Sequence, residues 1–151
     1  MANPDHLAEL KNGVESWNRW REKNPDIVPD LFEAKFAEAN LAGVNFENAN
    51  LGRAYFYLAS LEGANLQKAN LFQALLTEAN LKDANLTEAN LQRATLMETK
   101  LIGADLTRAE LMETNLEQAD LEDANLSQAN FAGANLINAN LQNAITDETN
   151  F

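Results

Sequence analysis

A five-residue period governs most of this chain. From Leu31 through Leu141, every fifth residue is Leu or Phe, which gives 23 such centres in succession. The residue two places before a centre is almost always Ala, as in the stretch 64–66, and no insertion or deletion disturbs the phase. Such a repeat is interpreted before any local secondary structure, because it constrains the whole fold.

Neither regular secondary structure accommodates this period. In an α-helix, five residues advance about 500°, so successive centres lie about 140° apart and form no common face. In a flat strand, five steps place successive centres on alternate faces. A short extended step followed by a corner every five residues removes the conflict. The Ala and Leu of each repeat then both point inward, and corners of one sense close the chain into a coil.

A second period indicates the size of the coil. Six positions spaced twenty residues apart hold residues that accept a positive φ or a tight turn; they are Gly43, Gly63, Asp83, Gly103, Asp123 and Asn143. The equivalent positions in the other three phases are mostly Glu, Gln, Arg and Lys. We therefore predict four repeats per coil, with special backbone geometry in one column of corners out of four.

The tandem A-[N/D]-L-x-x motif of residues 29–151 resembles the pentapeptide-repeat family. The resemblance implies an all-β fold, a right-handed quadrilateral β-helix of about six coils, whose interior is filled by Leu, Phe and Ala. The stretch from Trp17 to Leu31 also looks like the leader of some cyanobacterial members. Because the biochemical role of much of the family is unassigned, the resemblance leaves the function open.

The N-terminal segment is predicted to form a helix over residues 4–22, with Asn3 as its N-cap and Pro4 in its first turn. Its apolar residues fall at helical spacing; they are Leu7, Leu10, Val14 and Trp17, with Trp20 beside them. The ends of a solenoid need covers, so we interpret residues 1–28 as a helical cap with its connector and residues 29–151 as the β-helix. A partner-binding helix is the alternative.

The chain offers little of the chemistry that catalysis requires. It contains no Cys, a single His (His6), and neither an H-E-x-x-H motif nor a Gly-rich phosphate loop. His6 is expected to be a solvated residue. We expect no enzyme activity, no cofactor and no metal site. There is neither a secretory signal nor a run of about 18 apolar residues, so we expect a cytoplasmic location and no membrane contact.

The net charge of −12 argues against direct nucleic-acid binding, which needs a surplus of Lys and Arg. The acids gather toward the C-terminal end, because residues 109–151 hold eight acidic residues and no basic ones. The candidate acidic end comprises Glu110, Glu113, Glu117, Asp120, Glu122 and Asp123. A calcium site would need six to eight converging oxygens, and no loop supplies them.

An apolar surface patch is the main candidate site for a partner. With twenty residues per coil, Tyr55 and Leu75 stack on one face, and Tyr57 and Met97 share the neighbouring column. The candidate patch comprises Tyr55, Tyr57, Leu58, Phe72, Leu75 and Met97, with Phe72 on the adjoining face. Contiguous apolar patches mark interaction sites. Two alternatives remain open: the leader or the connector of residues 22–30 covers the patch, or the patch has no role.

We expect a non-enzymatic scaffold that binds another protein. The alternative, implied by the resemblance, is an acidic DNA mimic, since some family members protect the topoisomerase gyrase by occupying its DNA-binding groove. This chain departs from that pattern, because basic residues interrupt its middle and it lacks a C-terminal dimerisation helix; the basic residues are Lys82, Arg93, Lys100 and Arg108.

The C-terminal coil has no evident cover. Thr146 breaks the series of centres, and Ile145 and Phe151 could meet a second chain there in an end-to-end homodimer. Asp147 and Glu148 would face their own copies and oppose it.

Overall fold

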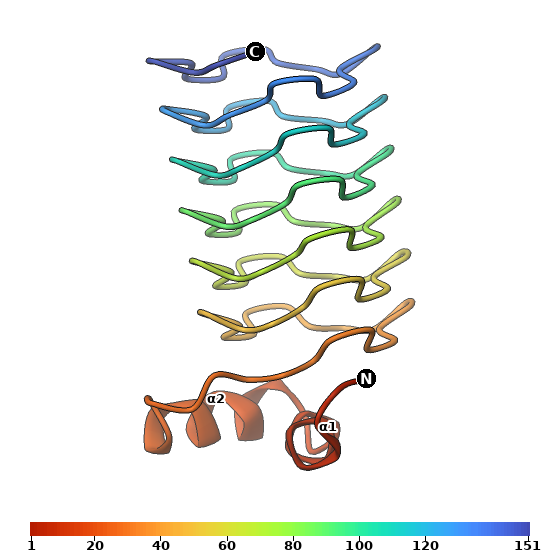
Figure 1. Cartoon of the computed structure of the whole chain (residues 1–151), viewed down its shortest axis with the longest axis vertical. Coiled ribbons are helices and arrows are strands. Elements are labelled where there is room, and N and C mark those ends of the chain that lie inside the picture. Colours follow the sequence, from red (N-terminus) through yellow and green to blue (C-terminus); the bar gives the residue numbers. More distant parts are fainter.

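The computed structural model describes all residues 1–151 as a rod of stacked coils with two helices at one end (Figure 1). Parallel bridges join each residue before a centre to the residue twenty positions later, from Asp30↔Asn50 to Asn130↔Asn150. One coil is therefore four repeats long, and the predicted fold, a right-handed four-sided β-helix with an N-terminal helical cap, is confirmed.

Backbone hydrogen bonds hold the coils together, and the same pattern recurs in every repeat that has a following coil beside it. In the first one, the Leu31 N–H donates to the carbonyl of Asn50 at 2.8 Å, and the Glu33 N–H donates to that of Gly52 at 2.9 Å. Within the corner, the Ala34 N–H donates to the Leu31 carbonyl at 3.0 Å. Each coil thus satisfies the peptide groups of its neighbours, as buried backbone requires.

The corners use the left-handed backbone region on all four sides of the rod. The second residue after every centre has a positive φ, including Leu58 (56°), Arg93 (58°) and Glu98 (54°). With the hydrogen bond across the corner, this geometry is that of type II turns. The prediction of special geometry in one column of four was therefore wrong. The twenty-residue coil that it suggested is right, but Gly, Asn and Asp fill only one of the four corner columns throughout, and each of the other three contains a single Gly or Asn.

The interior follows the five-residue period. Every centre from Leu31 to Phe131 is buried, together with the inward column two residues before the centres from Val44 to Ala129, whereas Ala39 is partly exposed. Three residues of the full column are Thr. Thr99 and Thr114 are buried because their hydroxyls find carbonyl partners: Thr99 Oγ1 donates to Leu76 O at 2.8 Å, and Thr114 Oγ1 donates to Leu111 O at 2.6 Å. Thr149, in the last coil, is partly buried. The centres Leu136 and Leu141, in the last coil of the structure, are only partly buried.

The cap consists of two helices, α1 (Pro4–Lys11) and α2 (Val14–Lys23), where the sequence predicted one. The chain turns between them at Gly13, whose φ is +97°, a value that glycine adopts without steric cost. The predicted N-cap is confirmed, because Asn3 Oδ1 accepts the N–H of Asp5 at 2.9 Å. The break lets both helices lie beneath the first coil (Figure 1).

Side chains from both helices anchor the cap to the first coil. Trp17 is fully buried, and its Nε1–H donates to the Asn45 carbonyl at 2.8 Å. The guanidinium of Arg21 donates to the carbonyl of Glu47 at 2.9 Å. The prediction that His6 is simply solvated was wrong: it is half-buried, and its Nδ1 accepts the N–H of Asp30 at 2.9 Å.

Candidate interaction surface

No catalytic or metal-binding constellation emerges from the structure. No three His, Cys, Asp or Glu side chains converge in a way that could hold a metal ion. A polar recess of about 260 Å³ lies between α2 and the first coil, where the Arg21 guanidinium lies among carboxylates and amides rather than beside a nucleophile. None of the helices is long and apolar enough to cross a membrane.

Four residues of the predicted patch lie together on one face of the rod. Tyr55 and Leu75 occupy neighbouring coils and are joined by a parallel bridge. The rings of Tyr55 and Tyr57 stack with their centroids 6.3 Å apart. Leu58 follows Tyr57 at the adjacent corner. Tyr55, Leu58 and Leu75 are 39%, 44% and 43% exposed, which is high for large apolar side chains on a folded rod.

The other two predicted residues extend or leave this patch. Met97 is partly exposed and lies two coils above Tyr57 in the same column, with Thr77 between them. Phe72 lies on the adjoining face, where its N–H donates to Asn70 Oδ1 at 3.2 Å. We therefore define the docking face as Tyr55, Tyr57, Leu58, Leu75 and Met97. The cap lies beneath the first coil rather than over this face (Figure 1).

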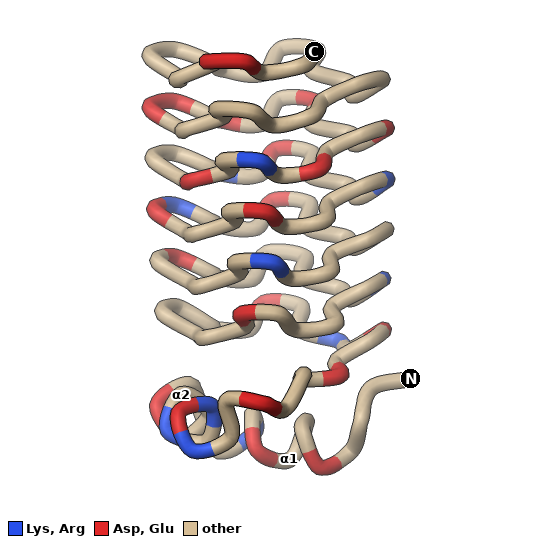
Figure 2. The backbone as a smooth tube through the Cα atoms, turned by 60° about the vertical axis from the view of Figure 1, so that its left-hand side comes forward, with Lys and Arg blue, Asp and Glu red and all other residues tan.

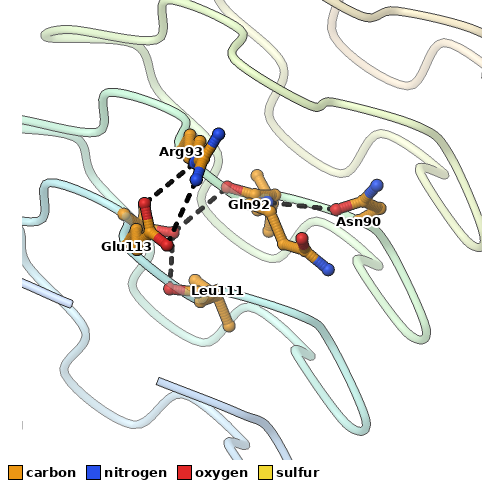
Figure 3. Close-up of polar contacts among 7 residues, drawn as sticks. Asn90, Gln92, Arg93, Leu111 and Glu113 are labelled. Carbon is orange, nitrogen blue, oxygen red and sulfur yellow. Dashed lines mark hydrogen bonds and ion pairs between the residues drawn. The ribbon is translucent and has the colours of Figure 1, made fainter. Parts of the chain in front are cut away.

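The docking face departs from the local hydrogen bonding of the rod. At most positions before a centre, an Asn or Asp side chain accepts the N–H two residues later, as Asn90 Oδ1 does from Gln92 at 3.1 Å (Figure 3). Tyr55 and Leu75 occupy such positions and cannot make this bond. The chain has replaced a stabilising local contact with exposed apolar surface at two stacked positions, so local structure does not explain these two residues.

An acidic rim borders the docking face along one corner. Glu38, Glu78 and Glu98 occupy the corner column that also contains Leu58, and all three are exposed. None of them forms an ion pair. The Glu78 carboxylate raises the pKa of the Tyr57 phenol, because it disfavours a second negative charge nearby. The face therefore combines apolar contact area with unpaired negative charge.

The effect of Glu78 on Tyr57 can be tested by titration. In a Tyr55→Phe background, Glu78→Gln should lower the pKa of Tyr57 toward its ordinary value, because the repulsion that favours the neutral phenol is gone. Phenolate absorbance against pH measures this. Gln118→Ala, in the same column but farther up the rod, is the control and should leave the titration unchanged. An unaltered Tyr57 titration in the Glu78→Gln variant would show that the Glu78 carboxylate does not act on the Tyr57 phenol.

The predicted acidic end does not form a converging site. Its residues occupy different faces and corners of the upper coils, and the nearest basic residues lie in the middle of the rod (Figure 2). Glu113 is paired with Arg93, whose Nε lies 2.8 Å from Glu113 Oε2 (Figure 3), and this hydrogen bond lowers the pKa of Glu113. Asp120 and Glu122 both accept from the Asn140 amide, at 2.9 and 3.2 Å. Glu110 accepts from Asn130, while Glu117 and Asp123 lie on other columns.

The fold and its surface thus define a solenoid whose sides display side chains rather than enclose a pocket. Two family models match the chain, "Pentapeptide repeat region" over residues 30–106 and "Pentapeptide repeats" over residues 109–145. The chain belongs to the pentapeptide-repeat family. No curated protein sequence matches it significantly.

Solved structures of cyanobacterial proteins are similar to this chain. The pentapeptide-repeat protein Rfr23 from Cyanothece is 32% identical, with a TM-score of 0.61, and the match covers 89% of this chain and 97% of that one. HetL, a Nostoc protein involved in the regulation of heterocyst differentiation, is 30% identical with a TM-score of 0.50, covering 79% and 70%. The fluoroquinolone resistance protein QnrB1 matches at 17% identity over 77% and 79%, and its TM-score of 0.31 supports no functional argument.

Proposed function

We propose that this chain is a non-enzymatic scaffold that binds a partner protein through the docking face. The observation that carries the proposal is the pair Tyr55 and Leu75, stacked in adjacent coils where Asn would otherwise cap the backbone. Exposed aromatic and aliphatic side chains that lie together are typical of the centres of protein interfaces. Membership of a family of repeat scaffolds is consistent with this role.

The rod suits such a role because its surface is preorganised. Coil-to-coil hydrogen bonds near 2.7–3.2 Å fix the backbone beneath every residue of the docking face. A partner therefore meets side chains whose backbone is already ordered, which lowers the entropic cost of binding. The unpaired rim of Glu38, Glu78 and Glu98 favours a partner whose apolar side chains are flanked by Lys or Arg.

Affinity capture from source-cell lysate tests the proposal. Tyr57→Glu combined with Leu75→Glu should abolish capture of the partner, because two buried carboxylates would oppose the apolar contact. Gln67→Glu with Thr87→Glu is the matched control, since it adds the same charge to the opposite face, and it should capture normally. Equal capture by both variants, with unchanged far-UV spectra, would remove the docking face from the interaction.

A second copy of the chain is a further candidate partner, at the C-terminal coil. Ile145 and Phe151 are 48% and 58% exposed there, and the centre Leu141 is only half-covered. A pairing of two such ends would bury these side chains and satisfy open peptide groups. Asp147 and Glu148 would repel their copies, so the dimer should be strengthened by salt.

Sedimentation equilibrium measures this pairing. We expect a concentration-dependent dimer of the 151-residue chain, which Ile145→Asp should weaken, because it adds charge to an apolar contact. Ile102→Asp, in a middle coil, is the control and should not change the equilibrium. A monomer at all concentrations, in low and high salt, would contradict the proposal.

The DNA-mimic alternative is not proposed. Basic residues lie among the acids in the lower and middle coils (Figure 2), and an exposed ion pair joins Arg93 to Glu113. No observation of the structure favours a continuous acidic surface.

A further inference from the structure

An apolar groove separates α1 from the first coil at one corner of the rod. Its volume is about 270 Å³, and Leu7 and Leu10 of α1 face Phe36 and Leu41 of the coil across it. This groove borders the docking face, because Lys35, which lines the groove, is joined to Tyr55 by a parallel bridge, but none of the docking-face residues lines the groove. Any ligand that enters it touches both the cap and the solenoid.

The groove exists because the cap covers the first coil incompletely. Ala39 belongs to the inward-pointing Ala column and lines the groove. It is partly exposed, whereas Ala59 and Ala79, its equivalents in the next two coils, are 1% and 0% exposed. The Ala column, which is buried in the coils that follow, is thus open to solvent at this point, as it is again only in the last coil, at Ala134, Ala139 and Ala144. The apolar surface here lacks a cover that the chain itself provides elsewhere.

Two unpaired cations flank this apolar surface. Lys11 at the end of α1 and Lys35, directly after the first corner, both line the groove and are exposed. Neither ammonium group forms an ion pair, although the chain carries a net charge of −12. An occupant that offers carboxylates beside an apolar group would satisfy both features at once.

We propose that the groove binds a short segment of a partner protein in which one large apolar side chain is flanked by Asp or Glu. The volume is smaller than the roughly 300–1,000 Å³ of pockets that enclose whole small molecules, so it fits a protruding side chain. The apolar side chain packs on Leu7, Leu10 and Phe36, and the flanking carboxylates pair with the two lysines. The groove therefore favours a partner segment with acidic residues, whereas the docking face favours one with basic residues.

Panning a display library of random dodecapeptides against the full chain tests this inference. Peptides with an aromatic or aliphatic residue between acids should be enriched about tenfold or more over the unselected library, which corresponds to about 1.4 kcal/mol of preferential binding. Lys11→Glu with Lys35→Glu should reverse the charge of the selected peptides from acidic to basic. Lys82→Glu with Lys100→Glu is the matched control, because those lysines are also exposed and unpaired, and it should leave the acidic selection intact.

The outcomes separate the groove from the docking face. Tyr57→Glu with Leu75→Glu, which leaves the groove untouched, should not change the acidic selection. If Tyr57→Glu with Leu75→Glu abolishes the acidic selection while Lys11→Glu with Lys35→Glu does not, the peptides bind the docking face and the groove inference is overturned. Absence of enrichment, or acidic selection that persists in Lys11→Glu/Lys35→Glu, also overturns it. Self-association lost only in the lysine variant would assign the groove to a second copy of the chain and overturn the proposed partner.

Discussion

Replacing Trp17 with Ala should lower the free energy of unfolding by about 3–5 kcal/mol, the range for a large aromatic side chain removed from a core. Trp17 is fully buried, and its ring meets that of Phe46 edge-on at a centroid distance of 5.8 Å. The substitution would leave the Asn45 carbonyl without its indole donor and would expose Phe46 at the open end of the solenoid. The lost free energy of unfolding therefore has two sources, the cavity left by the indole ring and the exposure of the first coil.

The effect of Trp17→Ala should be concentrated at the N-terminal end, because each coil of a solenoid is stabilised mainly by its neighbours. Urea unfolding measures the total loss, and hydrogen exchange should show faster opening of residues 31–50 than of the middle coils. Trp20→Ala is the control, since that ring is only partly buried, and its effect should be smaller. A loss below about 1 kcal/mol for Trp17→Ala would mean that the cap does not stabilise the rod.

Leu76→Ala should cost about 2–5 kcal/mol, the range for a leucine removed from a rigid core. Leu76 is fully buried in the middle of the rod, with coils on both sides. Stacked coils joined by continuous hydrogen bonds cannot collapse into the space, so the cavity should persist and the loss should lie in the upper part of that range.

Leu136→Ala is the matched comparison, because Leu136 occupies the same column of the last coil and is only partly buried. Its removal should cost less than half as much, since part of its surface already meets water. Urea denaturation of the two variants in parallel measures the difference. Equal losses at Leu76 and Leu136 would contradict the view that burial between coils sets the contribution of a centre.

The sequence predicts the solenoid well because its period excludes the other regular structures. The inward Ala and Leu columns and the Asn3 cap of the first helix are found where the sequence places them. The left-handed corners at residues such as Arg93 and Glu98 could not be predicted from propensity. A non-Gly residue in that region costs roughly 1–2 kcal/mol, and only the hydrogen bonds to the adjacent coils make the cost tolerable.

Other features depend on tertiary placement. The break at Gly13 and the contact of His6 with Asp30 follow from the angle at which the cap meets the coil, which no local pattern specifies. The groove beside Ala39 has the same origin.

The docking face is partly predictable, because Tyr55 and Leu75 stack once the coil length is known. Its acidic rim was missed, although the same twenty-residue spacing aligns Glu38, Glu78 and Glu98 with Leu58.

The dissociation constant of the captured partner, measured with purified components, tests the scaffold proposal most directly. We predict that Tyr57→Glu with Leu75→Glu weakens binding by about 100-fold or more, equivalent to about 2.7 kcal/mol. Gln67→Glu with Thr87→Glu should bind within about twofold of wild type, a difference of about 0.4 kcal/mol. Equal dissociation constants for wild type and both variants would contradict the proposal that this face of the rod carries the interaction.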